Sequence, residues 1–134
     1  CYDNMLFDIT KADSVQALPN LVGDWQATGE SAKILKKEVP AVKSHGAHTE
    51  FTSTSIEYNF TEQQGRLLKG TKVSENRTEK FVCAIGFDNK SIRCTDEDGL
   101  QEGQLVSDNE IIMYYHQIDD DISVINQAKL TKKP

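Results

Sequence analysis

Apolar and polar residues alternate along most of the chain after residue 21. Ile56, Tyr58 and Phe60, for example, are separated by polar or charged residues. A repeat of two residues is typical of a β-strand that buries one face. The strands predicted from this pattern are 22–28, 31–37, 49–62, 66–74, 78–87, 90–96, 99–107, 109–117 and 121–131. No helical repeat is long enough to connect parallel strands, so consecutive strands are expected to pair antiparallel.

Residues typical of turns separate the predicted strands. The clearest signal is Asp98-Gly99, because both central residues of a type I′ hairpin turn need a positive φ. Short strands at regular intervals predict an all-β sandwich or barrel. We expect an antiparallel up-and-down β-barrel of about eight strands in residues 21–134, preceded by a tether in residues 1–20.

Further rows of alternating apolar residues indicate which faces turn inward. One row contains Phe81, Cys83, Ile85 and Phe87. Another contains Ile122, Val124, Ala128 and Leu130, and Asn126 interrupts it. The segment 111–116 differs, because both of its faces are apolar or aromatic. A strand buried on both sides predicts an outer contact, and we expect a homodimer through strand 109–117.

The three cysteines carry information about compartment. Cys83 and Cys94 flank the turn 88–90, and in a hairpin they fall at or next to facing positions, within reach of a disulfide. Two buried free thiols are the alternative. The sequence begins at Cys1, which is either the lipid-bearing residue of a bacterial lipoprotein or an arbitrary boundary. With a disulfide and a lipidated Cys1, we expect an extracytoplasmic protein, periplasmic or anchored to the outer membrane.

Charge and composition exclude several classes of function. The 134 residues have a net charge of -6, whereas a nucleic-acid-binding protein needs a basic face. No apolar stretch is long enough to span a membrane, so membrane contact is expected only through a lipid on Cys1. No cofactor is predicted.

Acidic residues gather in two turns that an up-and-down barrel places at the same end. Between Cys94 and Ala128 the chain has no Lys or Arg. Asp96, Asp98, Asp119 and Asp121 are weak candidates for a Ca²⁺ site, because carboxylate oxygens are the ligands that Ca²⁺ prefers. A solvated acidic surface is the commoner explanation of such turns.

The run Leu21-Val22-Gly23-Asp24-Trp25 opens the first strand. Its Gly-x-Trp resembles the calycin barrels, which include lipocalins, fatty-acid-binding proteins and avidins. Segments 23–30 and 98–103 look most similar to uncharacterised bacterial avidin-like barrel proteins. The resemblance covers about residues 21–131 and implies that Trp25 plugs one end of a barrel. It does not imply biotin binding, because Trp25 is the one Trp of the chain and Ala27 stands where avidins have Asn, although Ser31 matches an avidin Ser.

These observations favour a binding protein for a small, largely apolar ligand. The residues expected to line or floor the cavity are Trp25, Tyr58, Phe60, Phe81 and His116. The alternative is a plugged barrel that acts as a structural or interaction protein, through strand 109–117 or the acidic rim. A third hypothesis is an enzyme of the cyclase or dirigent type, which would need an inward carboxylate or His beside the pocket. No inward carboxylate is evident, so no catalytic residue is predicted.

Overall fold

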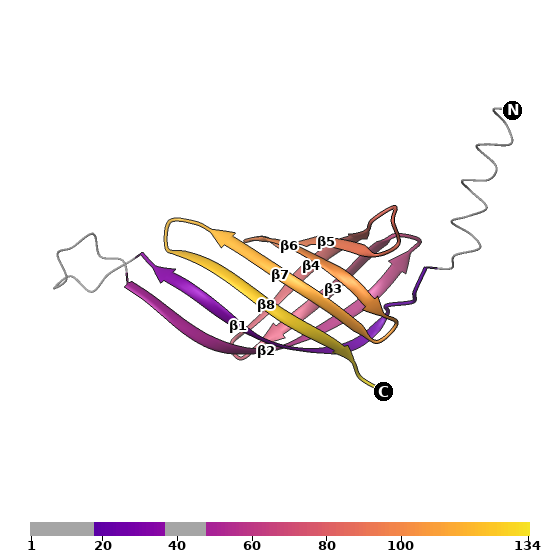
Figure 1. Ribbon diagram of the computed structural model, residues 1–134, viewed down its shortest axis with the longest axis horizontal. Coiled ribbons are helices and arrows are strands. Elements are labelled where there is room, and N and C mark those ends of the chain that lie inside the picture. Colours follow the sequence, from indigo (N-terminus) through magenta and orange to yellow (C-terminus); the bar gives the residue numbers. More distant parts are fainter. Residues whose placement is uncertain (1–17, 37–47) are drawn as a thin grey trace, which may run out of the picture.

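The computed structural model describes residues 18–36 and 48–134. The described residues form a closed antiparallel barrel in which each strand pairs with the next and the last pairs with the first (Figure 1). Its strands are β1 (Gly23–Leu35), β2 (His48–Gln64), β3 (Leu67–Ser74), β4 (Arg77–Ile85), β5 (Ser91–Thr95), β6 (Leu100–Ser107), β7 (Glu110–Ile118) and β8 (Ile122–Lys132). The predicted all-β up-and-down barrel is therefore confirmed.

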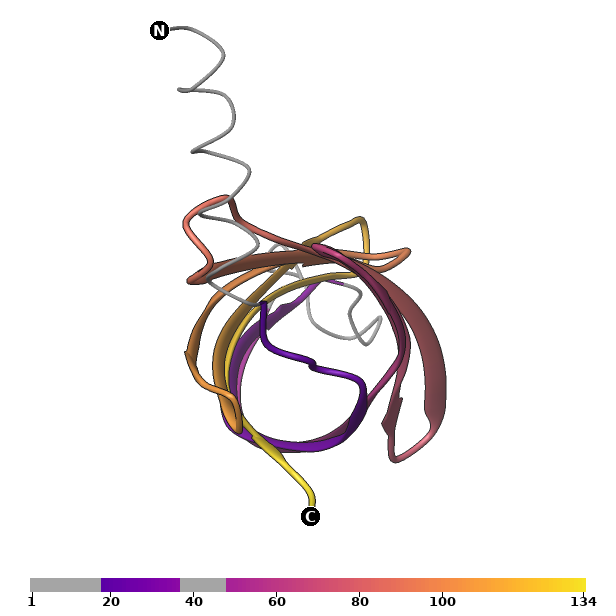
Figure 2. The same cartoon turned by 90° about the vertical axis from the view of Figure 1, so that its right-hand side faces the viewer.

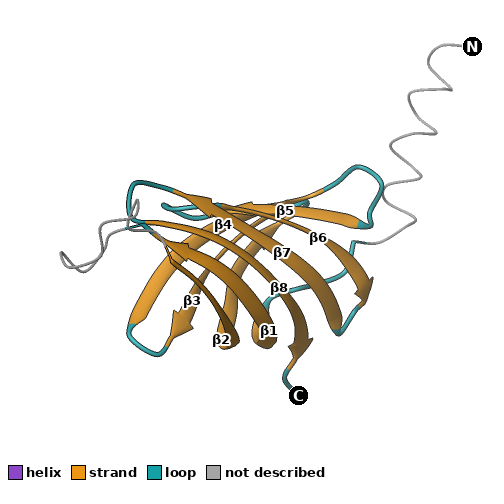
Figure 3. Ribbon diagram, turned by 60° about the vertical axis from the view of Figure 1, so that its left-hand side comes forward, coloured by secondary structure: helices purple, strands orange, loops and turns teal. Residues whose placement is uncertain are grey.

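Only strands, turns and loops are found in the described part of the chain (Figure 3). Accordingly, no helix there could cross a membrane. The predicted tether in residues 1–20 lies almost entirely outside the described residues.

The first two predicted strands are in fact one. The gap predicted between residues 28 and 31 is absent, because β1 continues through Gly29, which pairs with Thr54 on β2 and Ala128 on β8. A Cβ atom at Gly29 would collide with the backbone of Gln127 and Ala128. This glycine therefore permits a close approach between β1 and β8 and does not make a turn.

The type I′ turn predicted at Asp98-Gly99 is wrong, because neither residue has a positive φ. Instead Asp96 Oδ1 accepts hydrogen bonds from the amides of Asp98 and Gly99, at 2.8 and 2.7 Å. A short acidic side chain can hold a turn in this way without left-handed backbone. Positive φ values occur elsewhere, at Gly23, Gly65 and Asn89.

The half of the barrel around Trp25 is filled with apolar side chains. The Trp25 ring lies edge-on to Phe60, with centroids 6.0 Å apart, and Phe60 lies edge-on to Phe81 at 5.2 Å. Figure 2 looks along the barrel and shows the segment before β1 crossing this opening. Leu21 in that segment is buried, and its carbonyl accepts the Trp25 indole N–H at 2.9 Å. Trp25 thus closes one end, as the resemblance implied.

A disulfide joins the hairpin of β4 and β5. Cys83 and Cys94 are directly opposed across the two strands and are bonded. Both lie in the buried core, with Phe81 and Ile85 of the same inward row. Phe87, predicted as the next member of that row, is instead exposed, because β4 ends at Ile85.

Candidate functional site

One row of inward-facing side chains runs around the whole barrel, each paired with the next on the neighbouring strand. From β3 round to β2 its members are Leu68, Cys83, Cys94, Gln101, Tyr115, Asn126, Ser31 and Thr52. The first three belong to the apolar core, and the other five are polar. We call the apolar core around Trp25 the apolar half of the interior, and the polar side chains from Gln101 round to Thr52, together with Lys72 and Asp96, the polar half.

Gln101 is the central member of the row. Its side chain is fully buried, at 0% exposure, yet neither its amide nitrogen nor its amide oxygen has a hydrogen-bond partner of good geometry among the described residues. The Tyr58 oxygen faces this amide from β2. Burying an amide without partners costs about 1–3 kcal/mol, and proteins rarely keep such a group without a reason.

A buried ion pair lies in the polar half. The Lys72 ammonium on β3 donates to the Asp96 carboxylate, and their side chains are 10% and 0% exposed. The ammonium also lies 4.5 Å from the centroid of the Tyr115 ring, within range of a cation–π contact. Burial alone would raise the pKa of Asp96, but the hydrogen bonds from Lys72 and two backbone amides outweigh it and lower this pKa. Asp96 is therefore an anion at neutral pH.

Two phenols face the same region. Burial raises the pKa of Tyr58, the neighbouring Gln101 amide opposes this rise, and the negative charges of Asp96 and Glu79 add to it. Burial and the same two carboxylates also raise the pKa of Tyr115. Both hydroxyls are therefore protonated at neutral pH and can donate hydrogen bonds. The Tyr115 hydroxyl donates to Gln117 at 2.9 Å.

Small polar side chains complete the polar half on β8, β1 and β2. The Asn126 amide donates to the hydroxyl of Ser31 and, at 3.1 Å, to that of Thr54. Within the part of the chain that the structure describes, the buried hydroxyl oxygen of Thr52 has no hydrogen-bond partner. Asn126, Thr52 and Thr54 are only half-buried, whereas the rings of the apolar half are buried. The polar half is therefore less completely buried than the apolar half.

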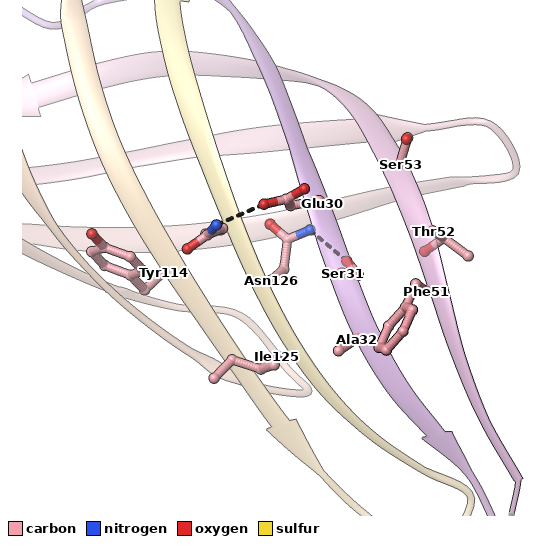
Figure 4. Close-up of a pocket in the computed structure, with 10 residues that line it drawn as sticks. Glu30, Ser31, Ala32, Phe51, Thr52, Ser53, Tyr114, Ile125 and Asn126 are labelled. Atoms are coloured by element: carbon pink, nitrogen blue, oxygen red, sulfur yellow. Dashed lines mark hydrogen bonds between the residues drawn. The ribbon is translucent and has the colours of Figure 1, made fainter.

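A separate hollow lies on the outer surface of the same strands (Figure 4). Its sides are two rows of outward side chains. The first contains Tyr114, Gln127, Glu30 and Ser53, and the second Ile125, Ala32 and Phe51. The Gln127 side chain donates a hydrogen bond to Glu30 at 2.8 Å, and the Asn126 amide donates to Ser31, as Figure 4 shows. Because side chains alternate between faces, the first bond lies outside the barrel and the second inside it.

Four of the five predicted cavity residues face the interior, but they lie in different parts of it. Trp25, Phe60 and Phe81 pack against one another and fill the apolar half. Tyr58 lies at the boundary, opposite Lys72 on β3. The interior position predicted for His116 is wrong, because alternation along β7 turns Tyr115 inward and His116 outward, where it is exposed.

The four acidic residues considered as Ca²⁺ ligands do not come together as one set in the described structure. Asp96 turns inward to Lys72, and Asp98 binds Arg77 at 3.1 Å. In the β7–β8 turn, Asp119 accepts hydrogen bonds from the Gln117 side chain and from the amides of Asp121 and Ile122, which together lower its pKa. Within residues 18–36 and 48–134, no three His, Cys, Asp or Glu side chains lie close enough to hold a metal ion.

The sequence analysis missed the inward polar residues Lys72, Glu79 and Gln101. The sequence spacing does indicate the inward carboxylates, since Glu79 lies two residues before the inward Phe81 and Asp96 two residues after the inward Cys94. Alternation places both carboxylates inside. Charged side chains are almost never buried unless they are paired, and the partner, Lys72, is on a different hairpin.

The chain matches no protein-family model, and a search of curated proteins found no relative. The resemblance to calycin barrels therefore remains a prediction from the sequence.

Proposed function

We propose that this barrel binds a small polar molecule in the polar half of its interior. The observation that carries the proposal is Gln101, whose buried amide nitrogen and oxygen make no hydrogen bond of good geometry within the described residues, although the Tyr58 hydroxyl faces them. A ligand that supplies both partners would recover the free energy lost by burying them. In a desolvated site these hydrogen bonds are stronger than in water.

The charges of the site favour an uncharged ligand. The positive charge of Lys72 is balanced by Asp96, and Glu79 nearby is itself bound to Arg77 at 3.4 Å. A second anion or cation would disturb these pairs. The largely apolar ligand expected from the sequence would compete for space with Phe60 and Phe81, which pack on each other. We therefore replace it with a neutral molecule that carries adjacent hydrogen-bond donor and acceptor groups.

Binding is favoured over catalysis by the state of the inward carboxylate. Asp96 already accepts hydrogen bonds from Lys72 and two backbone amides, and its pKa is lowered. A carboxylate held in this way is a poor general base. Glu79, the other inward carboxylate, is bound to Arg77 at 3.4 Å, so it too is engaged by a neighbouring charge.

The buried disulfide supports an extracytoplasmic location, since such bonds persist in oxidising compartments. The predicted lipid on Cys1 lies outside the described residues. A lipid-anchored or secreted binding protein is the setting that we propose for this barrel.

The test compares wild-type protein with Gln101→Leu by thermal unfolding in a panel of neutral amides, lactams and ureas, with fatty acids as the apolar comparison. Gln104→Leu is the matched control, because Gln104 is exposed on the same strand. We expect a stabilising member of the amide panel for wild type and Gln104→Leu, and no stabilisation of Gln101→Leu. The same stabilisation in all three proteins, or stabilisation by fatty acids alone, would contradict the proposal.

A further inference from the structure

One long stretch of strand has a neighbour on one side only. β2 pairs with β1 from His48 to Phe60, whereas β3 pairs only with Glu57–Gln64, so β2 extends well past the end of β3 (Figure 1). Among the described residues, Thr49–Ile56 therefore has a partner strand only in β1. We call Thr49–Ile56 the free edge of β2. On the side away from β1, its alternate backbone N–H and C=O groups can pair with a further strand.

A one-sided stretch of β4 is protected in ways that the free edge of β2 is not. β5 pairs with β4 only at Val82–Ile85, which leaves Arg77–Phe81 with β3 alone. This stretch carries the charged residues Arg77 and Lys80, and Arg77 binds Asp98 of the β5–β6 turn at 3.1 Å. Charged side chains and a covering turn both hinder the addition of a strand.

The composition of the free edge of β2 favours strand addition. It contains no Lys, Arg or Pro, and the register shift of β2 lies outside it, at Phe60/Glu62. Most of its residues are β-branched or aromatic, as is common in strands. Its single charge is Glu50, which is paired with Lys33, of opposite charge, on β1. A further strand would therefore meet few charges along this edge.

We propose that the free edge of β2 pairs antiparallel with the same edge of a second copy of this chain, around a two-fold axis at Thr52. Such a contact uses the same surface on both copies. Glu50 then lies opposite Thr54 of the second copy, and Phe51 opposite Ser53 of the second copy. Facing residues point to the same side of the sheet, so β7, β8, β1 and β2 of the two copies form one continuous sheet.

The Thr52 hydroxyl favours both a second copy and this axis. Its oxygen is buried and has no hydrogen-bond partner within residues 18–36 and 48–134. An axis at Thr52 places the two Thr52 side chains at facing positions, where threonine pairs hydrogen-bond across antiparallel strands. Each hydroxyl would thus gain the partner that it lacks in the single chain.

The charge and the aromatic side chain of the edge fit the same register. The two Glu50 carboxylates lie apart, each opposite a threonine, whereas an axis at Glu50 would place like charges face to face, which is destabilising. Phe51 is 87% exposed. With the axis at Thr52, the two Phe51 rings occupy diagonal positions, within reach of each other across the strands. The free edge is therefore complementary to itself, which favours a second copy over an unrelated strand.

Sedimentation equilibrium tests the proposal at protein concentrations of about 1 to 100 μM, a range chosen to bracket common homodimer affinities. We expect wild type to form dimers and Ser53→Lys to associate roughly 100-fold more weakly, because lysine protects strand edges. Ser53 is exposed and faces outward. Gln104→Lys is the matched control, since Gln104 is exposed on β6, away from this edge. It should leave the dimer intact, and circular dichroism should show that both variants fold.

Cysteine cross-linking tests the axis, in a Cys1→Ser background that prevents linkage through Cys1. Thr52→Cys should oxidise to a covalent dimer, because facing Cβ atoms lie about 4.5–5.5 Å apart, close to the separation in a disulfide. Thr54→Cys is the matched control on the same face of β2. It should remain unlinked on non-reducing electrophoresis, because it lies opposite Glu50 of the second copy.

Three results would overturn the proposal. The first is a wild-type monomer throughout the concentration range, even one that binds a synthetic peptide of residues 49–56. The second is a dimer that persists in Ser53→Lys, as a dimer through strand 109–117 would. The third is cross-linking through Thr54→Cys in place of Thr52→Cys. Ser53 points away from the interior, so sedimentation of Ser53→Lys is independent of the ligand test at Gln101.

Discussion

Lys72 and Asp96 meet inside the barrel, although they lie on different hairpins and are separated by 24 residues. The ion pair connects β3 to the turn between β5 and β6, and the Tyr115 ring from β7 covers the ammonium. Three parts of the wall are thus linked across the polar half. The ion pair therefore holds these three parts of the barrel together in the polar half of the interior.

Asp96→Asn should destabilise the protein at neutral pH by roughly 2–4 kcal/mol, because it leaves the Lys72 ammonium buried without a counter-charge. The asparagine oxygen can still accept the two turn amides, so the change isolates the charge. Urea unfolding at pH 7 measures the loss. In the double variant Lys72→Met/Asp96→Asn, part of the stability should return, since no unpaired charge remains.

The pH dependence of wild-type stability provides a second measurement of the same pair. The pKa of Asp96 is lower in the folded protein than in the unfolded chain, where it is about 3.9. The stabilisation is therefore complete above that value and is lost as the pH falls through the folded-state pKa. The difference in unfolding free energy between wild type and Asp96→Asn should shrink below pH 4. A constant difference down to pH 2 would show that the charge is not its cause.

Reduction of the disulfide should lower stability without changing the fold. Cys83 and Cys94 close a short loop, with a sequence separation of 11, for which chain entropy gives about 2–3 kcal/mol. The measurement is urea unfolding of Cys83→Ala/Cys94→Ala beside the oxidised wild type. Cys94 pairs with Gln101 on the neighbouring strand. The variant therefore also tests whether the disulfide positions Gln101, and we expect a stabilising ligand to raise its unfolding temperature less than that of wild type. Equal stability of the two proteins would contradict the expected loss.

Trp25 should report on the apolar half directly, since it is the one Trp of the sequence and is 0% exposed. Its fluorescence should be blue-shifted and inaccessible to iodide, and both properties should disappear on unfolding. Trp25→Phe should cost less than Trp25→Ala, for which about 3–5 kcal/mol is expected from the cavity. Phenylalanine keeps most of the contact with Phe60 but loses the donor to the Leu21 carbonyl. Quenching of the wild-type fluorescence by iodide would contradict the burial of this ring.

Gly29→Ala should be among the most damaging single changes, because the new methyl group would collide with the β8 backbone. We expect a loss above 2 kcal/mol, since overpacking against backbone cannot be relieved by a side-chain rotation. Gly65→Ala is the comparison: its φ is +61°, and apart from its chain neighbours no atom of the described residues lies within 4 Å of the added methyl carbon, so the cost should be about 1–2 kcal/mol from backbone strain alone. Thermal unfolding of both variants measures the difference. A smaller loss at Gly29 than at Gly65 would show that β1 and β8 can separate there.

Much of the fold followed from alternation alone. Ile56, Tyr58 and Phe60 face inward as predicted, and Cys83 faces Cys94 because a tight turn fixes the hairpin register. These features depend on neighbours in sequence, where a repeat of two residues and a turn leave few choices.

The errors arose where a distant strand decides the outcome. Gly29 resembles a break until the approach of β8 is known. Asp96 resembles a surface carboxylate until Lys72 on another hairpin is brought beside it. The inward position predicted for His116 failed for a different reason, since alternation from Met113 was sufficient to place it outside.

Closure between β1 and β8 also affects how the protein must be made. β8 completes the hydrogen bonding of β1 and of β7, so the barrel cannot close until residues up to about Lys132 have been synthesised. A nascent chain lacking β8 would present two unsatisfied strand edges at once, and such edges promote aggregation. Synthesis or translocation of this protein should therefore be most vulnerable just before its final strand emerges, the stage at which a chaperone would have the greatest effect.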